Sequence, residues 1–302
     1  MEEVIMHKNV NIKNIEFEWL NPLKNEIFYG GYFAALGSPC LIISTSILLN
    51  IKIAIPMLLI SYLLPLMIYS YDYYKDIDKD IKNNSERAIF LKKKADKYPF
   101  VFSFYFLLLI SLLVLYANYN LIAFIVAIMV GGILYNVVLK DLTKKIPAFK
   151  NVFTASIWAM VGAFFPLLYY SMGMNLSFII VFLLIFLRTM INVIFFDLKD
   201  IDNDKSDDLK TLPVILGKEN TTKLLHFINV IAFFPLILGI YFSIVNIVAV
   251  FLLPFVFYGY FYISKANSAS SNELEKAAHT LADLEFVLWP IVLIIALFFG
   301  IG

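Results

Sequence analysis

Nine long apolar runs divide this chain, and they constrain its fold more than any other feature. Each is about as long as the roughly 20 residues with which a helix crosses the hydrocarbon core of a bilayer. The runs lie at 27–49, 53–74, 99–119, 121–139, 150–171, 177–196, 221–242, 245–264 and 280–300. They lack the polar alternation of barrel strands, so we predict an all-α polytopic membrane protein with nine transmembrane helices.

The distribution of Lys and Arg predicts how these helices are oriented. Basic residues gather before the first run and in the connections after the second, fourth, sixth and eighth runs, whereas the alternate connections carry only Lys52. The positive-inside rule therefore predicts a cytoplasmic N-terminus and a C-terminus outside. Long inner loops and short outer ones also predict that the chemistry faces the cytoplasm.

The chain is expected to form one domain. Residues 1–25 are predicted to be a cytoplasmic N-terminal segment, because they carry charges and no apolar signal core. Trp19 and its apolar neighbours suggest an interfacial helix there. Residues 26–302 are predicted to be a single membrane domain. With a net charge of +1, no nucleic-acid partner is predicted, and the oligomeric state is left open.

Two acidic clusters sit where the second and sixth runs meet their inner loops. Their members are Asp72, Asp76 and Asp80 in the first cluster, and Asp197, Asp200 and Asp204 in the second. The spacings are i, i+4, i+8 and i, i+3, i+7, and each would place three carboxylates on one helical face. Because like charges repel, a bound divalent cation is expected to hold each set together.

Magnesium is the cation that this pattern favours. It is bound by a few carboxylates together with waters and substrate phosphate oxygens. Because there are two such sites at helix ends, we predict that Mg²⁺ ions bound there coordinate a diphosphate. The three histidines are scattered and Cys40 is the only cysteine, so neither a zinc site nor a disulfide framework is predicted.

Basic residues near the clusters are candidates for binding phosphate oxygens. Arg87 follows the first cluster, and Lys140 and Lys144 follow the fourth run. The positive-inside rule alone would also place most of these lysines, so that interpretation stays open. Arg188 lies within the sixth run, where an arginine needs a partner or a polar cavity, and we favour a structural pairing over a place in the substrate chamber.

At this point the chain resembles the UbiA superfamily of intramembrane prenyltransferases. That family has nine membrane helices and two Asp-rich motifs at the cytoplasmic ends of helices two and six. Asp76 and Asp80 match the aspartates of its first motif, and Asn83 and Arg87 match the following loop. Asp72 stands where the family usually has Asn, which adds a negative charge.

Further motifs extend the resemblance over roughly residues 25–300. The family's second motif and the stretch that follows it are matched by Asp197, Asp200, Asp204, Lys210-Thr211-Leu212-Pro213 and Gly217. The family element after helix four is matched by Tyr135, Leu139, Lys140 and Asn151. The Arg-Pro that the family often carries before its first helix is absent here.

The resemblance implies a Mg²⁺-dependent prenyltransferase with a central chamber that opens near the cytoplasmic side. A polyprenyl group would pass from an allylic diphosphate to an aromatic quinone precursor or to an isoprenoid lipid resembling geranylgeranylglyceryl phosphate. The implied metal ligands are the six aspartates of the two clusters. The implied catalytic residues are Asp76, Asp200, Tyr135 and Lys140, and the implied diphosphate-binding residues are Asn83, Arg87, Lys140, Lys144 and Lys210.

Three other functions remain open from the residues alone. A membrane transporter or ion-coupled carrier also uses acidic residues as cation sites, but those usually lie near the bilayer midplane on broken helices. A membrane phosphotransferase on lipid head groups would use Asp and metal, yet the Asp-Gly-x-x-Ala-Arg pattern of the CDP-alcohol type is missing. A non-catalytic relative is the third alternative.

Overall fold

The computed structural model is helical throughout the part of the chain that it describes. It describes residues 20–75, 77, 85–135 and 140–300, and only the backbone of residues 20–24, 85–87, 140 and 272. Helices make up 83% of the structure, and the described residues include no strand. The predicted all-α class is therefore confirmed.

Seven helical segments among the described residues are long and apolar enough to cross a membrane. They are Ile55–Lys75, Ala95–Tyr116, Phe149–Tyr169, Leu176–Asp197, Leu212–Tyr241, Ile247–Asn267 and Glu273–Phe298. Two shorter apolar helices are α2 (Tyr32–Leu48) and α7 (Tyr119–Leu134). Each of these nine segments overlaps one predicted run, which supports an integral multi-pass membrane protein. The count of nine spans stays a prediction, because α2 and α7 are shorter than a full span.

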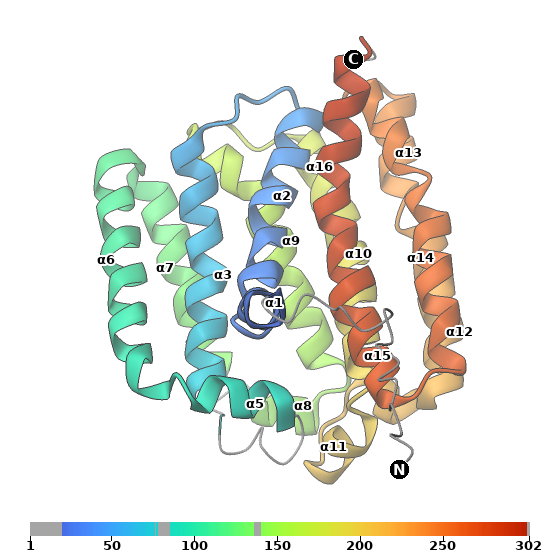
Figure 1. Ribbon diagram of the computed structural model, residues 1–302. Coiled ribbons are helices and arrows are strands. Elements are labelled where there is room, and N and C mark those ends of the chain that lie inside the picture. The colour runs from blue at the N-terminus through green and yellow to red at the C-terminus, as the bar shows by residue number, and fades with distance from the viewer. Residues whose placement is uncertain (1–19, 76, 78–84, 136–139, 301–302) are drawn as a thin grey trace, which may run out of the picture.

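The apolar helices of the seven long segments run side by side in one bundle (Figure 1). They are α3 (Ile55–Lys75), α6 (Tyr98–Tyr116), α9 (Phe149–Tyr169), α10 (Leu176–Asp197), α12 (Leu212–Ile231), α13 (Phe234–Tyr241), α14 (Phe255–Ser264) and α16 (Asp283–Phe298). In Figure 1, α6 and α7 form one flank, and α12, α13 and α14 form the other. The flanks are joined by α2, α3, α9, α10 and α16.

Short helices gather at one end of the bundle. They are α5 (Ser85–Lys92), α8 (Lys140–Lys145), α11 (Ile201–Ser206) and α15 (Ser271–Ala277), at the bottom of Figure 1. A further short helix, α1 (Leu20–Tyr29), precedes α2. The C-terminal ends of α3 and α10 point to the same end, so the fold brings Asp72 and Asp197 to one side of the bundle.

Small residues let α9 pack closely at the centre of the bundle. Ala159, Gly162 and Ala163 of α9 are buried. A Cβ atom added to Gly162 would lie 2.9 Å from a methyl of Ile185 and 3.1 Å from Leu41. Close approach of this kind suits helices within a membrane, where association depends on van der Waals packing and interhelical hydrogen bonds.

Arg188 holds the C-terminal half of the bundle together through a buried polar cluster. Its Nε donates a 2.8 Å hydrogen bond to Glu285 Oε1, and its Nη2 donates a 2.6 Å bond to Oε2. Asn229 accepts a bond from Nη1, and the Tyr262 hydroxyl donates to Glu285 at 3.3 Å. These side chains are about 1% exposed. The partner that Arg188 requires is therefore Glu285 on α16, which sequence reasoning had not identified.

Candidate functional site

The second acidic cluster lies on a broken helix. Helix α10 ends at Asp197, a turn follows, and Asp200 caps the start of α11, which carries Asp204. The Asp200 amide donates to the Asp197 carbonyl at 3.1 Å, which closes the turn. The prediction that these carboxylates share the face of one helix is therefore wrong, because the chain changes direction between the first and second of them.

Two of these carboxylates nevertheless converge on one cation, the ammonium of Lys150. Lys150 lies near the start of α9, and its Nζ is 2.6 Å from Asp197 Oδ1 and 4.0 Å from Asp204 Oδ2. The side chains of Asp197 and Asp204 are 4% and 10% exposed. Tertiary packing therefore achieves the convergence that a single helical face would have given.

Neighbouring polar side chains fix the orientation of the two carboxylates. Asn151 Nδ2 donates a 2.7 Å hydrogen bond to Asp197 Oδ2. The Thr211 hydroxyl donates a 3.0 Å bond to Asp204 Oδ2. Both partners come from motifs matched in the sequence, after the fourth run and after the second cluster.

Asp200 and Asp204 differ in their surroundings. Desolvation by burial raises the pKa of Asp204 to about 6, while the positive charge of Lys150 acts in the opposite direction. Asp200 is 34% exposed and forms a 3.2 Å ion pair with Lys199. Burial therefore destabilises the ionised carboxylate of Asp204, and a bound cation would stabilise it.

A cavity of about 290 Å³ adjoins this cluster. Its polar lining includes Asp72 of the first cluster, Lys150 and Tyr135. The rest is mainly apolar and aromatic, with Phe153 and Trp158 from α9. The Tyr135 ring stacks on Phe153 with centroids 5.1 Å apart. The cavity therefore joins an apolar interior to a charged end, which contains Asp72 of the first cluster and Lys150, the ion-pair partner of Asp197 in the second.

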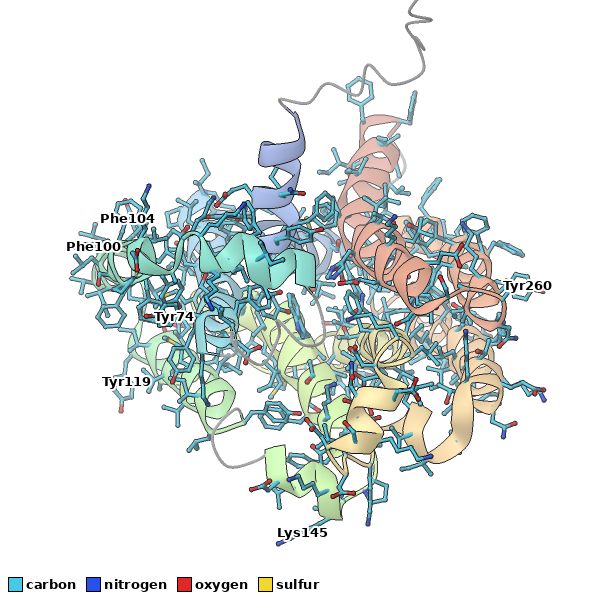
Figure 2. All side chains as sticks on the ribbon, turned by 60° about the horizontal axis from the view of Figure 1, so that its bottom comes forward. Tyr74, Phe100, Phe104, Tyr119, Lys145 and Tyr260 are labelled. Carbon is cyan, nitrogen blue, oxygen red and sulfur yellow. The ribbon has the colours of Figure 1, made fainter. Side chains whose placement is uncertain are left out.

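The structure describes only some of the remaining predicted site residues. Asp76, Asp80 and Asn83 lie outside the described residues, and for Arg87 and Lys140 only the backbone is described. Lys144 pairs with Asp141 at 3.3 Å on α8, while the Lys210 side chain is exposed. Figure 2 turns this end of the bundle toward the reader and shows Lys145 of α8 at its rim.

Sequence reasoning did not assign a site role to Lys150. Lys150 stands at the end of the connection after the fourth run, where a lysine fits the positive-inside rule without any role in a site. The available signal was its position directly before Asn151, a residue that the family resemblance had already marked.

The donor groups at the cavity fit a hard divalent cation. Carboxylate oxygens are the ligands that Mg²⁺ prefers, and Asp197 and Asp204 already hold one positive group between them. Within the described ranges, no three His, Cys, Asp or Glu side chains form a complete metal cluster. A complete site would therefore need oxygens from the first cluster, from substrate or from water.

Comparison with known proteins identifies proteins that are similar to this chain. The sequence profile of the UbiA prenyltransferase family matches residues 31–289. A digeranylgeranylglyceryl phosphate synthase of Methanosphaera stadtmanae is 31% identical over 108 residues, which are 36% of this chain and 39% of that protein. The match thus spans well under half of that curated relative.

Two solved structures share the fold. A UbiA homologue from Archaeoglobus fulgidus, bound to DMAPP and Mg²⁺, has a TM-score of 0.61 and 15% identity over 90% of this chain and 99% of its own. The apo structure of a UbiA homologue from Aeropyrum pernix K1 has a TM-score of 0.64 and 12% identity, over 87% of this chain and 98% of its own. At these identities the likeness establishes the fold.

Proposed function

Because the chain belongs to the UbiA prenyltransferase family, we propose that it transfers a polyprenyl group from an allylic diphosphate to an acceptor and releases diphosphate. The observation that carries this proposal is the cavity, whose apolar interior meets Asp72, Tyr135 and Lys150 at one end. An isoprenoid diphosphate has the same division, with an apolar tail and a strongly charged head.

The proposed cofactor is Mg²⁺, held by the two acidic clusters. Its ligands would be drawn from Asp72, Asp76, Asp80, Asp197, Asp200 and Asp204. When bound, the metal supplies positive charge that stabilises the departing diphosphate. The Archaeoglobus relative, which has the same fold, is bound to Mg²⁺ and DMAPP, and this supports the assignment.

The protein's own groups would bind and orient the donor. Asn83, Arg87, Lys140, Lys144 and Lys210 are the proposed diphosphate-binding residues, and we add Lys150 because its ammonium lines the cavity. The allylic C–O bond breaks, the acceptor forms the new bond to the allylic carbon, and the acceptor loses a proton. Apolar walls keep water away from the developing cation.

Tyr135 has a proposed role at the reacting carbon. Its ring lies in the cavity lining beside Lys150 and is held against Phe153. An aromatic face attracts a nearby cation through its quadrupole, so this ring would stabilise positive charge on the allylic group. Asp76, Asp200 and Lys140 complete the proposed catalytic set.

The proposed acceptor is an aromatic quinone precursor or an isoprenoid glyceryl phosphate. The partial match to a digeranylgeranylglyceryl phosphate synthase favours the second. We further propose that residues 26–302 form one domain of nine spans, with a central chamber open toward the cytoplasm, the N-terminus inside and the C-terminus outside. The asymmetry of Lys and Arg supports this orientation.

The test is a product assay on purified, membrane-reconstituted protein. Prenyl diphosphates of several chain lengths are combined with each acceptor type, and the prenylated product is identified by mass spectrometry. Product should form with Mg²⁺, vanish with excess EDTA and return when Mg²⁺ is restored. Absence of product in every combination would refute the transferase. Cation-coupled uptake into vesicles without product would instead favour a carrier.

A further inference from the structure

A second cavity, of about 270 Å³, lies where α1, the C-terminal end of α3 and the start of α6 meet. Its walls are largely aromatic and apolar, and they include Tyr73, Tyr74, Tyr98, Val101 and Tyr105. Figure 2 shows Tyr74 on the side of the molecule where Phe100 and Phe104 of α6 lie. None of the described residues that line this cavity was predicted for the site, so the proposed transfer leaves the cavity unexplained.

The apolar wall of this cavity continues onto the outer surface of α6. Val101 lines the cavity, and Phe104 and Leu108 follow it at spacings of three and seven residues, which place all three on one helical face. All three side chains are exposed. Helix α6 belongs to a membrane-length segment that buries little of its apolar surface inside the protein. An alkyl chain that leaves the cavity along this face would therefore lie in the bilayer.

Two lysines give the same cavity a positive charge. The charged side chains in its described lining are Lys94, Lys97 and Glu26, and the Glu26 carboxylate pairs with Lys94. Burial lowers the pKa of Lys94, and the nearby charge of Lys97 acts in the same direction, so the two ammonium groups repel each other. A single carboxylate does not balance two ammonium groups. A phosphate between them would neutralise the excess charge through charge-assisted hydrogen bonds.

These lysines lie where the apolar surface of α6 begins, which is the depth of the lipid head groups. They follow α5, which lies across the end of the bundle in Figure 1. Only three residues after Lys97, Phe100 is strongly exposed, as suits a side chain that faces lipid. Lysines next to a membrane span attract anionic lipids. The positive-inside rule alone would place lysines here, but it does not require that they line an apolar cavity.

We propose that the second cavity binds an anionic phospholipid of the surrounding bilayer. The lipid phosphate pairs with Lys97 and Lys94, the first part of one acyl chain lies beside Val101 and Tyr105, and the rest of the chain follows α6. A soluble anion would use only the lysines, and an uncharged lipid only the apolar wall. The proposal rests on the position of the chain in a membrane, so it does not depend on the proposed prenyl transfer.

Native mass spectrometry of the full chain, purified in detergent, measures lipid binding directly. Phosphatidylglycerol and phosphatidylcholine with the same acyl chains are titrated in separate experiments. The first phosphatidylglycerol should bind at least about fivefold more tightly than the first phosphatidylcholine, the scale of one lysine acting on an anionic lipid. Equal affinities would overturn the proposal, because recognition would then be apolar.

A matched pair of lysine variants tests whether the charge acts at the cavity. Lys97→Gln should lower the affinity for phosphatidylglycerol about fivefold and leave that for phosphatidylcholine unchanged. Lys93→Gln is the control, because Lys93 is an exposed lysine of the same segment that does not line the cavity. If Lys93→Gln weakens binding as much as Lys97→Gln, the whole basic segment attracts the lipid, and the cavity is not its site.

A second pair of variants tests the apolar part of the cavity. Val101→Trp fills space that the acyl chain would occupy, and it should lower the affinity for phosphatidylglycerol at least as much as Lys97→Gln does. Val114→Trp, the same substitution at an exposed position nearer the far end of α6, should leave this affinity unchanged. Unchanged binding to Val101→Trp would overturn the proposal. Displacement of the lipid by inorganic phosphate at the same concentration would also overturn it, because the site would then recognise a free anion.

Discussion

The Nζ atom of Lys150 lies 2.6 Å from Asp197 Oδ1, although the two residues are 47 positions apart on different helices. This contact places a lysine ammonium within the second acidic cluster, at the charged end of the first cavity. It makes Lys150 both the counterion of the cluster and a candidate ligand for the donor diphosphate.

Replacing Lys150 by Met should make stability depend on the metal. Without Mg²⁺, Asp197 loses its charged partner, and we expect a cost of about 1–3 kcal/mol, between the values for exposed and buried pairs. Saturating Mg²⁺ should recover most of this loss. Thermal unfolding in EDTA and in Mg²⁺ measures the effect. The control is Lys205→Met, at an exposed position on α11; equal metal responses in both variants would contradict the prediction.

Replacing Asp200 by Ala should lower turnover by about 100-fold, the scale for losing one group that stabilises charge in a transition state. Asp202→Ala is the matched control, because Asp202 lies two residues further on, in the first turn of α11, and is exposed. It should change turnover little. Initial rates at saturating Mg²⁺ and donor compare the two. Comparable losses in both would mean that general negative charge, rather than a defined ligand set, supports the reaction.

Replacing Asp72 by Asn should preserve substantial activity. Asp72 lines the first cavity, and the related family usually carries Asn at this position. An amide oxygen still offers a ligand to a cation or to an ordered water, although it brings no charge. Titration of activity with Mg²⁺ should give a turnover near wild type, with a higher Mg²⁺ requirement. A loss as large as that of Asp200→Ala would show that the charge itself is required.

Replacing Arg188 by Met should destabilise the bundle strongly. It would leave Glu285 buried and unpaired, at a cost of about 3–5 kcal/mol. The double variant with Arg188→Met and Glu285→Met should recover much of the loss, because neither charge is then left alone. The free energies of unfolding of the single and double variants, measured in detergent, form a double-mutant cycle. If the stability lost by the double variant equals the sum of the losses of the two single variants, Arg188 and Glu285 do not stabilise each other.

Much of the architecture could be predicted from the sequence. Transmembrane length and apolarity are local properties, so each predicted run overlaps an observed apolar helix. The boundaries were less accurate where helices break. The seventh run was placed at 221–242, but the helix begins at Leu212 and contains a non-helical Gly217 with φ of +74°. A glycine can adopt this positive φ with little steric strain, so it can kink the helix at this position.

The sequence by itself determined that this is a helical membrane protein of the UbiA family with two acidic clusters at helix ends, because apolar length and motif spacing are properties of contiguous residues. Only the tertiary structure decided which side chains meet. It broke the helix between Asp197 and Asp200, brought Lys150 to the cluster and paired Arg188 with Glu285. These contacts join residues 47 and 97 positions apart, and the packing of whole helices fixes such contacts, because the periodicity of one helix specifies its buried face but not its neighbour.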